Sequence, residues 1–109
     1  TVILLTGIIM LWNSSRADDK KYAELIKSPQ AGDVYRYKTI DGNFSTYQVF
    51  EVSEDSISIV PNNYEFSQKT GMEEIEVDSN YADFYFTVHK KYITDLHESD
   101  TLFQVLRNE

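Results

Sequence analysis

The chain has 109 residues, a net charge of −8 and no cysteine. This length is typical of a single domain, and the absence of cysteine excludes disulfides, thiolate zinc sites and thiol nucleophiles. Ten acidic residues and one basic residue lie between Asp41 and Asp83, a net charge of −9, and such an acidic surface argues against nucleic-acid binding because it repels phosphate groups.

The chain begins with an apolar segment that has no charged side chain and is interrupted only by Thr6 and Gly7. A helix of about twelve residues rises about 18 Å, less than the ~30 Å hydrocarbon core of a bilayer. We therefore expect residues 1–13 to be the C-terminal part of a transmembrane helix that begins upstream of Thr1. The expected anchor residues are Val2, Ile3, Leu4, Leu5, Ile8, Ile9, Leu11 and Trp12, with the indole at the lipid–water interface.

Two other interpretations of this segment remain open. It has the character of the apolar region of a cleaved signal peptide, with residues 13–17 as the cleavage region. Alternatively, it is a buried strand or helix of the domain itself. With an anchor, the chain is a single-pass membrane protein in contact with lipid. We expect its globular domain on the extracytoplasmic or periplasmic side, although Arg16, Lys20 and Lys21 by themselves favour the cytoplasmic side.

Residues 14–31 are expected to form a linker helix that ends before Pro29. Ser15 and Asp18 have the spacing of a capping box, and the residue before a proline is disfavoured in a helix. An apolar stripe on one face of this helix needs a partner, either the following domain or a neighbouring protein. Its members, which we consider as partner contacts, are Tyr22, Leu25 and Ile26.

Three strands in a meander are expected at the start of the domain that spans residues 32–109. They cover Val34 to Lys38, Phe44 to Ser53 and Ser56 to Val60, each with alternating apolar residues, and Pro61 follows the third. Asp41-Gly42 between the first two is a hairpin signal, which predicts a type I′ turn with positive φ at both central positions.

The second of these strands is expected to contain a β-bulge. Tyr47 and Val49 share one face, whereas Phe50 and Val52 continue the apolar pattern in the opposite phase. One extra residue in a strand causes such a shift and bends the strand.

A long connection follows, from residue 62 to residue 83. Glu73 to Val77 within it is expected to be a helical turn or a short strand, flanked by turn-forming residues. Because a structureless connection of this length is unusual in a compact domain, the segment is either a lid-like functional loop or contains a further element.

The remaining chain predicts a strand, a helix and a final strand. Phe84 to His89 alternates, Lys90 to Glu98 has the apolar residues of a short helix, and Thr101 to Arg107 alternates again. The fold class is therefore mainly β, with five strands, a long insert and a short helix before the last strand.

This order of elements resembles the Src-homology-3-like small barrel over residues 32–107. The sequence is also similar to small membrane-anchored proteins of Bacteroidota that carry such a domain after one transmembrane helix. The similarity rests on Gly32-Asp33-Val34-Tyr35, on residues 52–56 and on residues 60–65. The resemblance implies a five-stranded barrel and no particular activity. The long insert lies where a peptide-binding groove would be lined in such barrels, so that groove is not carried over.

Three groups of side chains deserve consideration as sites. The acids Glu73, Glu74, Glu76 and Asp78 are dense, but the Asp-x-Asp-x-Asp-Gly pattern of calcium loops is absent. His89 and His97 flank the expected helix, with Asp95 and Glu98 as carboxylates for a metal site, but their spacing of eight does not put both on one face. Phosphate loops and nucleophile elbows are absent, so we expect no catalytic residue, no metal and no cofactor.

Tyrosines form the third group, because on a small barrel their hydroxyls can reach solvent and line a recognition surface. The set is Tyr35, Tyr37, Tyr47, Tyr64, Tyr81, Tyr85 and Tyr92. We expect Tyr64, Tyr81 and Tyr85 to be the exposed members that contact a partner, and the others to close the core.

Three functions follow, in order of preference. The first is a non-catalytic accessory or interaction subunit of a membrane protein complex. The second is a free-standing anchored module that binds a peptide, glycan or cation through the tyrosine-rich insert. The third is a small hydrolase or metalloenzyme built around His89 and His97.

Overall fold

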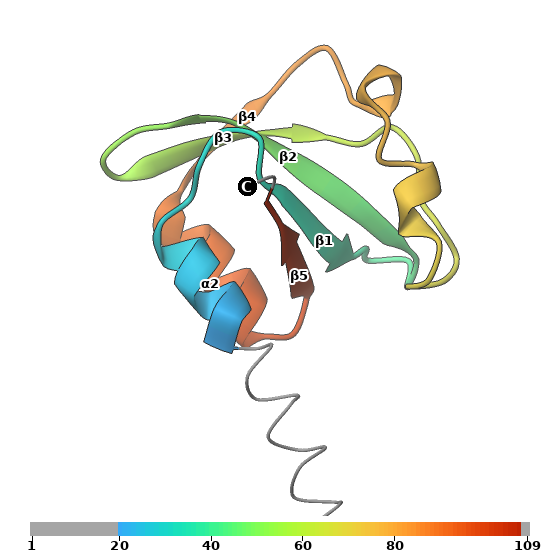
Figure 1. The fold of residues 1–109 in the computed structure, drawn as a ribbon, viewed down its shortest axis with the longest axis horizontal. Coiled ribbons are helices and arrows are strands. Elements are labelled where there is room, and N and C mark those ends of the chain that lie inside the picture. The colour runs from blue at the N-terminus through green and yellow to red at the C-terminus, as the bar shows by residue number, and fades with distance from the viewer. Residues whose placement is uncertain (1–19, 108–109) are drawn as a thin grey trace, which may run out of the picture.

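Figure 1 shows the fold in a computed structural model, which describes residues 20–107. The predicted anchor of residues 1–13 and the first part of the linker lie outside the described residues. Residues 20–27 are helical, as expected for the linker. Within residues 20–107, none of the helices combines the length and the apolar character needed to cross a bilayer.

Five strands form one antiparallel sheet in the order β4-β3-β2-β1-β5. This confirms the mainly β fold with five strands and a short helix before the last one. The elements are β1 (Val34–Lys38), β2 (Phe44–Val52), β3 (Ser56–Pro61), the 3₁₀ turns η1 (Met72–Glu74) and η2 (Asp78–Asn80), β4 (Phe86–His89), α2 (Lys90–Glu98) and β5 (Leu102–Leu106).

The bounds of β1 and α2 equal the predicted ones. The other strands differ from prediction by one or two residues at one end, or, for β5, by one residue at each end. Pro61 does not follow β3, as the sequence suggested, but is its last residue and lies opposite Tyr47. The pairing of β3 with β4 ends at Ile59, so the missing N–H of Pro61 breaks no bond to β4.

The main core lies between one face of the sheet and the two helices, which lie together beside the sheet in Figure 1. The strands supply alternate residues to it, as the period of two requires. Ile26 from residues 20–27 and Ile93 from α2 are both buried in this core. The full cluster is Ile26, Tyr35, Val49, Ile57, Ile59, Ile93, Leu102 and Val105.

The predicted bulge is present in β2. Val49 pairs with Ile59, but the next paired residue is Glu51, opposite Ser58, so the register shifts across Phe50. The shift lets both Val49 and Val52 pack with the core, while Phe50 stays exposed. This bend follows directly from the change of apolar phase in the sequence.

The predicted type I′ turn at Asp41-Gly42 is wrong. Gly42 has φ +86°, but Asp41 is not among the residues with positive φ. Gly42 N–H donates to Thr39 C=O, and Thr39 N–H donates to Asn43 C=O. These bonds describe a three-residue loop in which the glycine takes the left-handed position after an ordinary turn.

The insert of residues 62–83 packs against the sheet face opposite the core. Met72 is fully buried and Ile75 nearly so. Arg36, which points to this face because Tyr35 points to the other, donates two hydrogen bonds of 2.7 and 2.6 Å to the Glu76 carboxylate. The insert therefore contains two 3₁₀ turns and buried side chains. Of the two alternatives predicted at Glu73 to Val77, a helical turn or a short strand, the structure has the helical turn, as η1 at Met72–Glu74.

Candidate functional site

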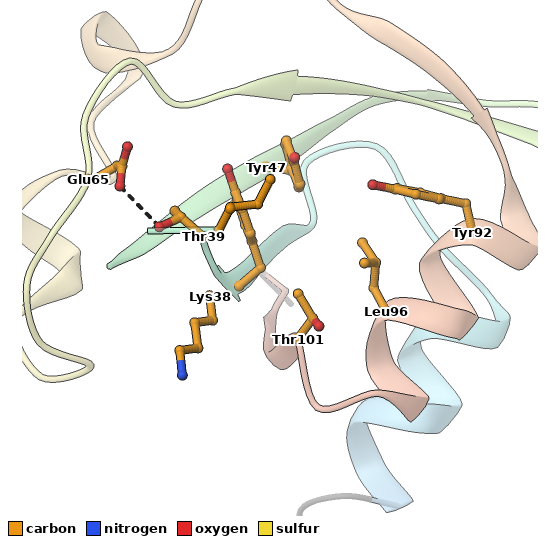
Figure 2. Close-up of a pocket in the computed structure, with 9 residues that line it drawn as sticks. Lys38, Thr39, Tyr47, Glu65, Tyr92, Leu96 and Thr101 are labelled. Atoms are coloured by element: carbon orange, nitrogen blue, oxygen red, sulfur yellow. Dashed lines mark hydrogen bonds between the residues drawn. The ribbon is translucent and has the colours of Figure 1, made fainter. Parts of the chain in front are cut away.

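A cleft of about 350 Å³ opens between the β1–β2 hairpin and α2. Figure 2 shows Tyr92 and Leu96 of α2 on one side of it and Glu65 on the opposite side. We call it the tyrosine cleft. Its lining residues are Tyr37, Lys38, Thr39, Ile40, Tyr47, Glu65, Tyr92, Leu96 and Thr101.

Two stacked tyrosines form the floor of the tyrosine cleft. Tyr47 lies opposite Tyr35 in the β1–β2 pair, and Tyr37 lies opposite Ser45, so Tyr37 and Tyr47 are diagonal neighbours on one face. Their ring centroids are 4.3 Å apart and the ring planes differ by 3°. Alternation along two neighbouring strands thus produces a flat aromatic surface.

Burial is the main cause of a raised pKa at Tyr47, and the neighbouring Tyr37 hydroxyl adds to it. The Tyr47 hydroxyl is therefore neutral at physiological pH. A neutral hydroxyl both donates and accepts hydrogen bonds, which suits recognition of a polar group better than proton abstraction.

The wall contributed by α2 depends on helical spacing. Tyr92 and Leu96 are four residues apart and share a face. Leu96 packs against the core, whereas the side chain of Tyr92 is 46% exposed. Tyr92 is therefore the most accessible of the three tyrosines that line the cleft.

The rim of the tyrosine cleft is polar. Glu65 accepts hydrogen bonds from Thr39 Oγ1 at 3.1 Å, drawn in Figure 2, and from Asn43 Nδ2 at 3.2 Å. Lys38 extends away from Tyr92 and Leu96 in the same view. Aromatic faces surrounded by a few fixed polar groups can hold a ligand or a partner side chain by stacking and hydrogen bonding.

The three tyrosines predicted to be exposed in and after the insert differ in their burial. Tyr64 and Tyr85 are exposed, as expected. The expectation for Tyr81 is wrong: it is half-buried, and its hydroxyl lies 2.9 Å from the hydroxyl of the buried Thr46. Burial raises its pKa. Tyr81 therefore fixes the insert to the sheet.

The apolar stripe of the first helix faces the domain. Ile26 belongs to the core, and Tyr22 and Leu25 pack against it half-buried. Of the two partners considered for this stripe, the domain itself is the one observed, and Ile26 is not available to another protein.

The two histidines are held apart by α2. His89 caps the helix, where its Nδ1 accepts from Lys91 N–H at 3.0 Å. His97 lies in the last turn, about 12 Å further along the axis. Within residues 20–107, no group of three or more potential metal ligands is close enough to hold an ion. Glu76 from the acidic run is bonded to Arg36 instead.

Sequence reasoning did not find the tyrosine cleft. Tyr37, Tyr47 and Tyr92 were expected to close the core with their hydroxyls in water, and Tyr47 does pack against the core. The cleft exists because α2 is placed next to a hairpin some 50 positions earlier in the chain. No local pattern carries that information.

Comparison with known proteins adds no relative: no family model, curated protein or solved structure matches this chain.

Proposed function

We propose that this chain is a non-catalytic accessory subunit of a membrane protein complex, anchored by one N-terminal helix, that binds a partner subunit through the tyrosine cleft. The observation that carries the proposal is the cleft itself: stacked Tyr37 and Tyr47 and the reachable Tyr92 around about 350 Å³. Tyrosines with one wet end are enriched where proteins recognise one another.

The SH3-like barrel is part of the same proposal. The strand order β4-β3-β2-β1-β5, with β1 bonded to both β2 and β5, supports it, as does the helix before the last strand. In this interpretation the tyrosine cleft lies on a barrel that residues 1–31 tether to the bilayer on its extracytoplasmic side.

The raised pKa values of four side chains support a binding role. Burial is the largest cause of the raised pKa at Tyr35, Tyr47 and Tyr81, and the hydrogen bond to Glu76 is the largest cause at Arg36. Each of these shifts favours the protonated form, so none of these four groups becomes a general base near neutral pH.

Affinity purification tests the proposal directly. The tagged full-length protein is purified from native membranes in a mild detergent, and co-purifying proteins are identified by mass spectrometry. Tyr92→Ala is expected to lose the partner. Val77→Ala is the matched control, because Val77 is 49% exposed against 46% for Tyr92 and does not line the cleft.

Three outcomes would each contradict a part of this function. Recovery of the chain alone from mild detergent would contradict its membership of a complex. Retention of the partner by Tyr92→Ala would contradict binding of the partner in the tyrosine cleft. Fractionation of the full-length protein with soluble proteins would contradict the proposed membrane anchor.

A ligand-binding module is the second candidate, and the cleft volume favours it. About 350 Å³ lies within the range of small-molecule sites, roughly 300–1,000 Å³. Calorimetric titration with short peptides, oligosaccharides and divalent cations separates this candidate from the first. Binding of one of these that Tyr92→Ala abolishes, in a protein that purifies without partners, would favour it.

A further inference from the structure

A second concave surface lies beside the start of β4, away from the tyrosine cleft. It has a volume of about 380 Å³ and is lined by Phe50, Val60, Ala82, Asp83, Phe84 and Tyr85. None of these residues lines the tyrosine cleft. We call this surface the aromatic groove.

Aromatic side chains flank β4 on both of its faces. Tyr85 stacks on Phe50 with centroids 5.3 Å apart, and Phe84 meets Phe86 edge to face at 5.5 Å. Successive residues of an extended chain point to opposite faces, so these two ring pairs lie on either side of the strand. All four side chains are between 48% and 55% exposed. Such a patch on a small domain marks an interaction surface.

β4 is a terminal strand of the sheet, and it pairs only with β3 in the part of the chain that the structure describes. Lys90 N–H donates to Asp55 C=O at 3.0 Å. Because bonded and non-bonded pairs alternate in an antiparallel ladder, Val88 and Phe86 direct their main-chain groups to β3. Thr87, which lies between them and is exposed, directs its N–H and C=O outward.

The charge at the start of β4, beside the aromatic groove, is suited to a basic partner. Asp83 lines the aromatic groove near the start of the strand, and the exposed Glu54 and Asp55 lie near its end. Lys90 and the exposed Lys91 follow the strand at that end and balance these two acids, and Lys90 Nζ donates to the Glu54 carbonyl oxygen at 2.9 Å. Lys69, the single base between Asp41 and Asp83, lies over the Phe103 ring at 4.6 Å instead.

We propose that the aromatic groove and the free edge of β4 bind an extended segment of a partner protein that carries aromatic or aliphatic anchors flanked by lysine or arginine. The segment adds a sixth strand through the main chain of Thr87, and its anchors contact the rings on both faces. Complementary charge selects a basic flank over an acidic one. This site does not depend on the tyrosine cleft.

The same charge disfavours two other occupants. A second copy of this chain would bring its own net charge of −8 to a chain of the same charge. An anionic membrane surface repels acidic residues in the same way. Residues 82–86 also lie at the opposite end of the molecule from residue 20, where the described chain begins (Figure 1).

The test uses the full chain in detergent and a fluorescein-labelled peptide, Lys-Lys-Val-Phe-Val-Phe-Lys-Lys, with anisotropy as the readout. We expect binding that is at least about tenfold weaker for the peptide with glutamates in place of its lysines. Equal binding of the two peptides, or no binding of either at about 1 mM, overturns the proposal.

Thr87 offers a sharp test of strand addition. Thr87→Pro removes the outward N–H and leaves the bonds to β3 intact, whereas Thr87→Ala keeps the N–H and loses only the hydroxyl that contacts Ser58. We expect Thr87→Pro to weaken peptide binding at least about tenfold and Thr87→Ala to leave it unchanged. Equal binding by these two variants, both folded by circular dichroism, overturns strand addition.

Two further variants distinguish binding in the aromatic groove from binding in the tyrosine cleft. Tyr85→Ala is expected to weaken peptide binding, and Tyr92→Ala is expected to leave it unchanged. The reverse result assigns the peptide to the tyrosine cleft and overturns the proposal. If the protein forms a concentration-dependent dimer that Thr87→Pro abolishes, the edge of β4 binds a second copy of the chain. That result also overturns the proposal.

A lipid occupant is tested with a single dye. Because the chain has no cysteine, Phe84→Cys accepts one polarity-sensitive fluorophore. In vesicles of phosphatidylcholine and phosphatidylglycerol, we expect its emission to shift to the blue only when the basic peptide is added. A shift before the peptide is added assigns the groove to lipid and overturns the proposal.

Discussion

Arg107 and Asp33 form a paired hydrogen bond that joins the two ends of the domain. Arg107 Nε donates to Asp33 Oδ1 and Nη2 to Oδ2, both at 2.8 Å. Nη2 also donates to the carbonyl oxygens of Ser28 at 2.8 Å and Leu25 at 3.3 Å, at the end of the first helix. The Asp33 residue is 1% exposed and the Arg107 side chain 13%. One guanidinium thus connects the helix end, the entry to β1 and the exit from β5.

Replacing Asp33 is expected to be strongly destabilising. Asp33→Ala leaves the Arg107 guanidinium without its carboxylate in a mostly buried place, which lowers the free energy of unfolding by about 3–5 kcal/mol. Urea denaturation measures this change. Asp83→Ala is the exposed control and should change it by less than about 0.5 kcal/mol. A similar small change for Asp33→Ala would contradict the structural role of the pair.

Tyr35→Phe is expected to stabilise the domain. The Tyr35 side chain is fully buried, and its hydroxyl has no hydrogen-bond partner in the part of the chain that the structure describes. Removing an unsatisfied buried hydroxyl while keeping the ring raises the free energy of unfolding by about 1 kcal/mol. Thermal denaturation followed by circular dichroism checks it. A lower melting temperature would show that the hydroxyl is bonded, for example to an ordered water.

Stability is expected to fall at alkaline pH. Burial is the largest cause of a pKa raised above 10.0 at Tyr35 and Tyr47 in the folded chain. The unfolded chain, whose tyrosines titrate near pH 10, then loses protons first. The stabilisation from neutral tyrosine is complete below about pH 10 and decreases as the pH rises toward the folded pKa values.

Urea midpoints measured at several pH values between about 8 and 11 test this dependence. In Tyr35→Phe/Tyr47→Phe the decline should be shallower, because two of the shifted groups are gone. An unchanged decline in that variant would contradict the assignment to these tyrosines.

Truncation of Tyr81 should destabilise the domain, whereas truncation of Tyr64 should change its stability little. Tyr81→Ala removes a half-buried ring and the hydroxyl contact with Thr46, and lowers the free energy of unfolding by about 2 kcal/mol or more. Tyr64→Ala removes an exposed ring, so the change stays within about 0.5 kcal/mol. Chemical denaturation of the two variants side by side decides the matter, and equal losses would count against the placement of Tyr81.

Met72→Ala tests whether the insert is part of the cooperative fold. Met72 lies in the insert and has no exposed surface, so truncating it leaves a buried cavity. We expect the free energy of unfolding to fall by about 2–4 kcal/mol, with one transition. A separate early transition, with the main one unchanged, would mean that the insert unfolds on its own.

Local sequence patterns were sufficient for most secondary structure. β1 and α2 were predicted to the residue because alternation and helical spacing depend only on near neighbours. The bulge at Phe50 was visible as a change of phase. The turn at Asp41 was not, because Asp-Gly fits two kinds of loop, and the bonds between Thr39 and Asn43 choose between them.

What the sequence determined alone was therefore the series of elements, the mainly β class, the acidic character and the absence of thiol chemistry. Only the tertiary structure decided that Tyr92 and Tyr47 line one cleft, that Tyr85 stacks on Phe50, and that Arg107 reaches Asp33 across 74 positions. Those contacts depend on which faces the sheet, the helices and the insert bury against one another. Burial is non-directional and acts between segments far apart in the chain, so no short window of sequence records it.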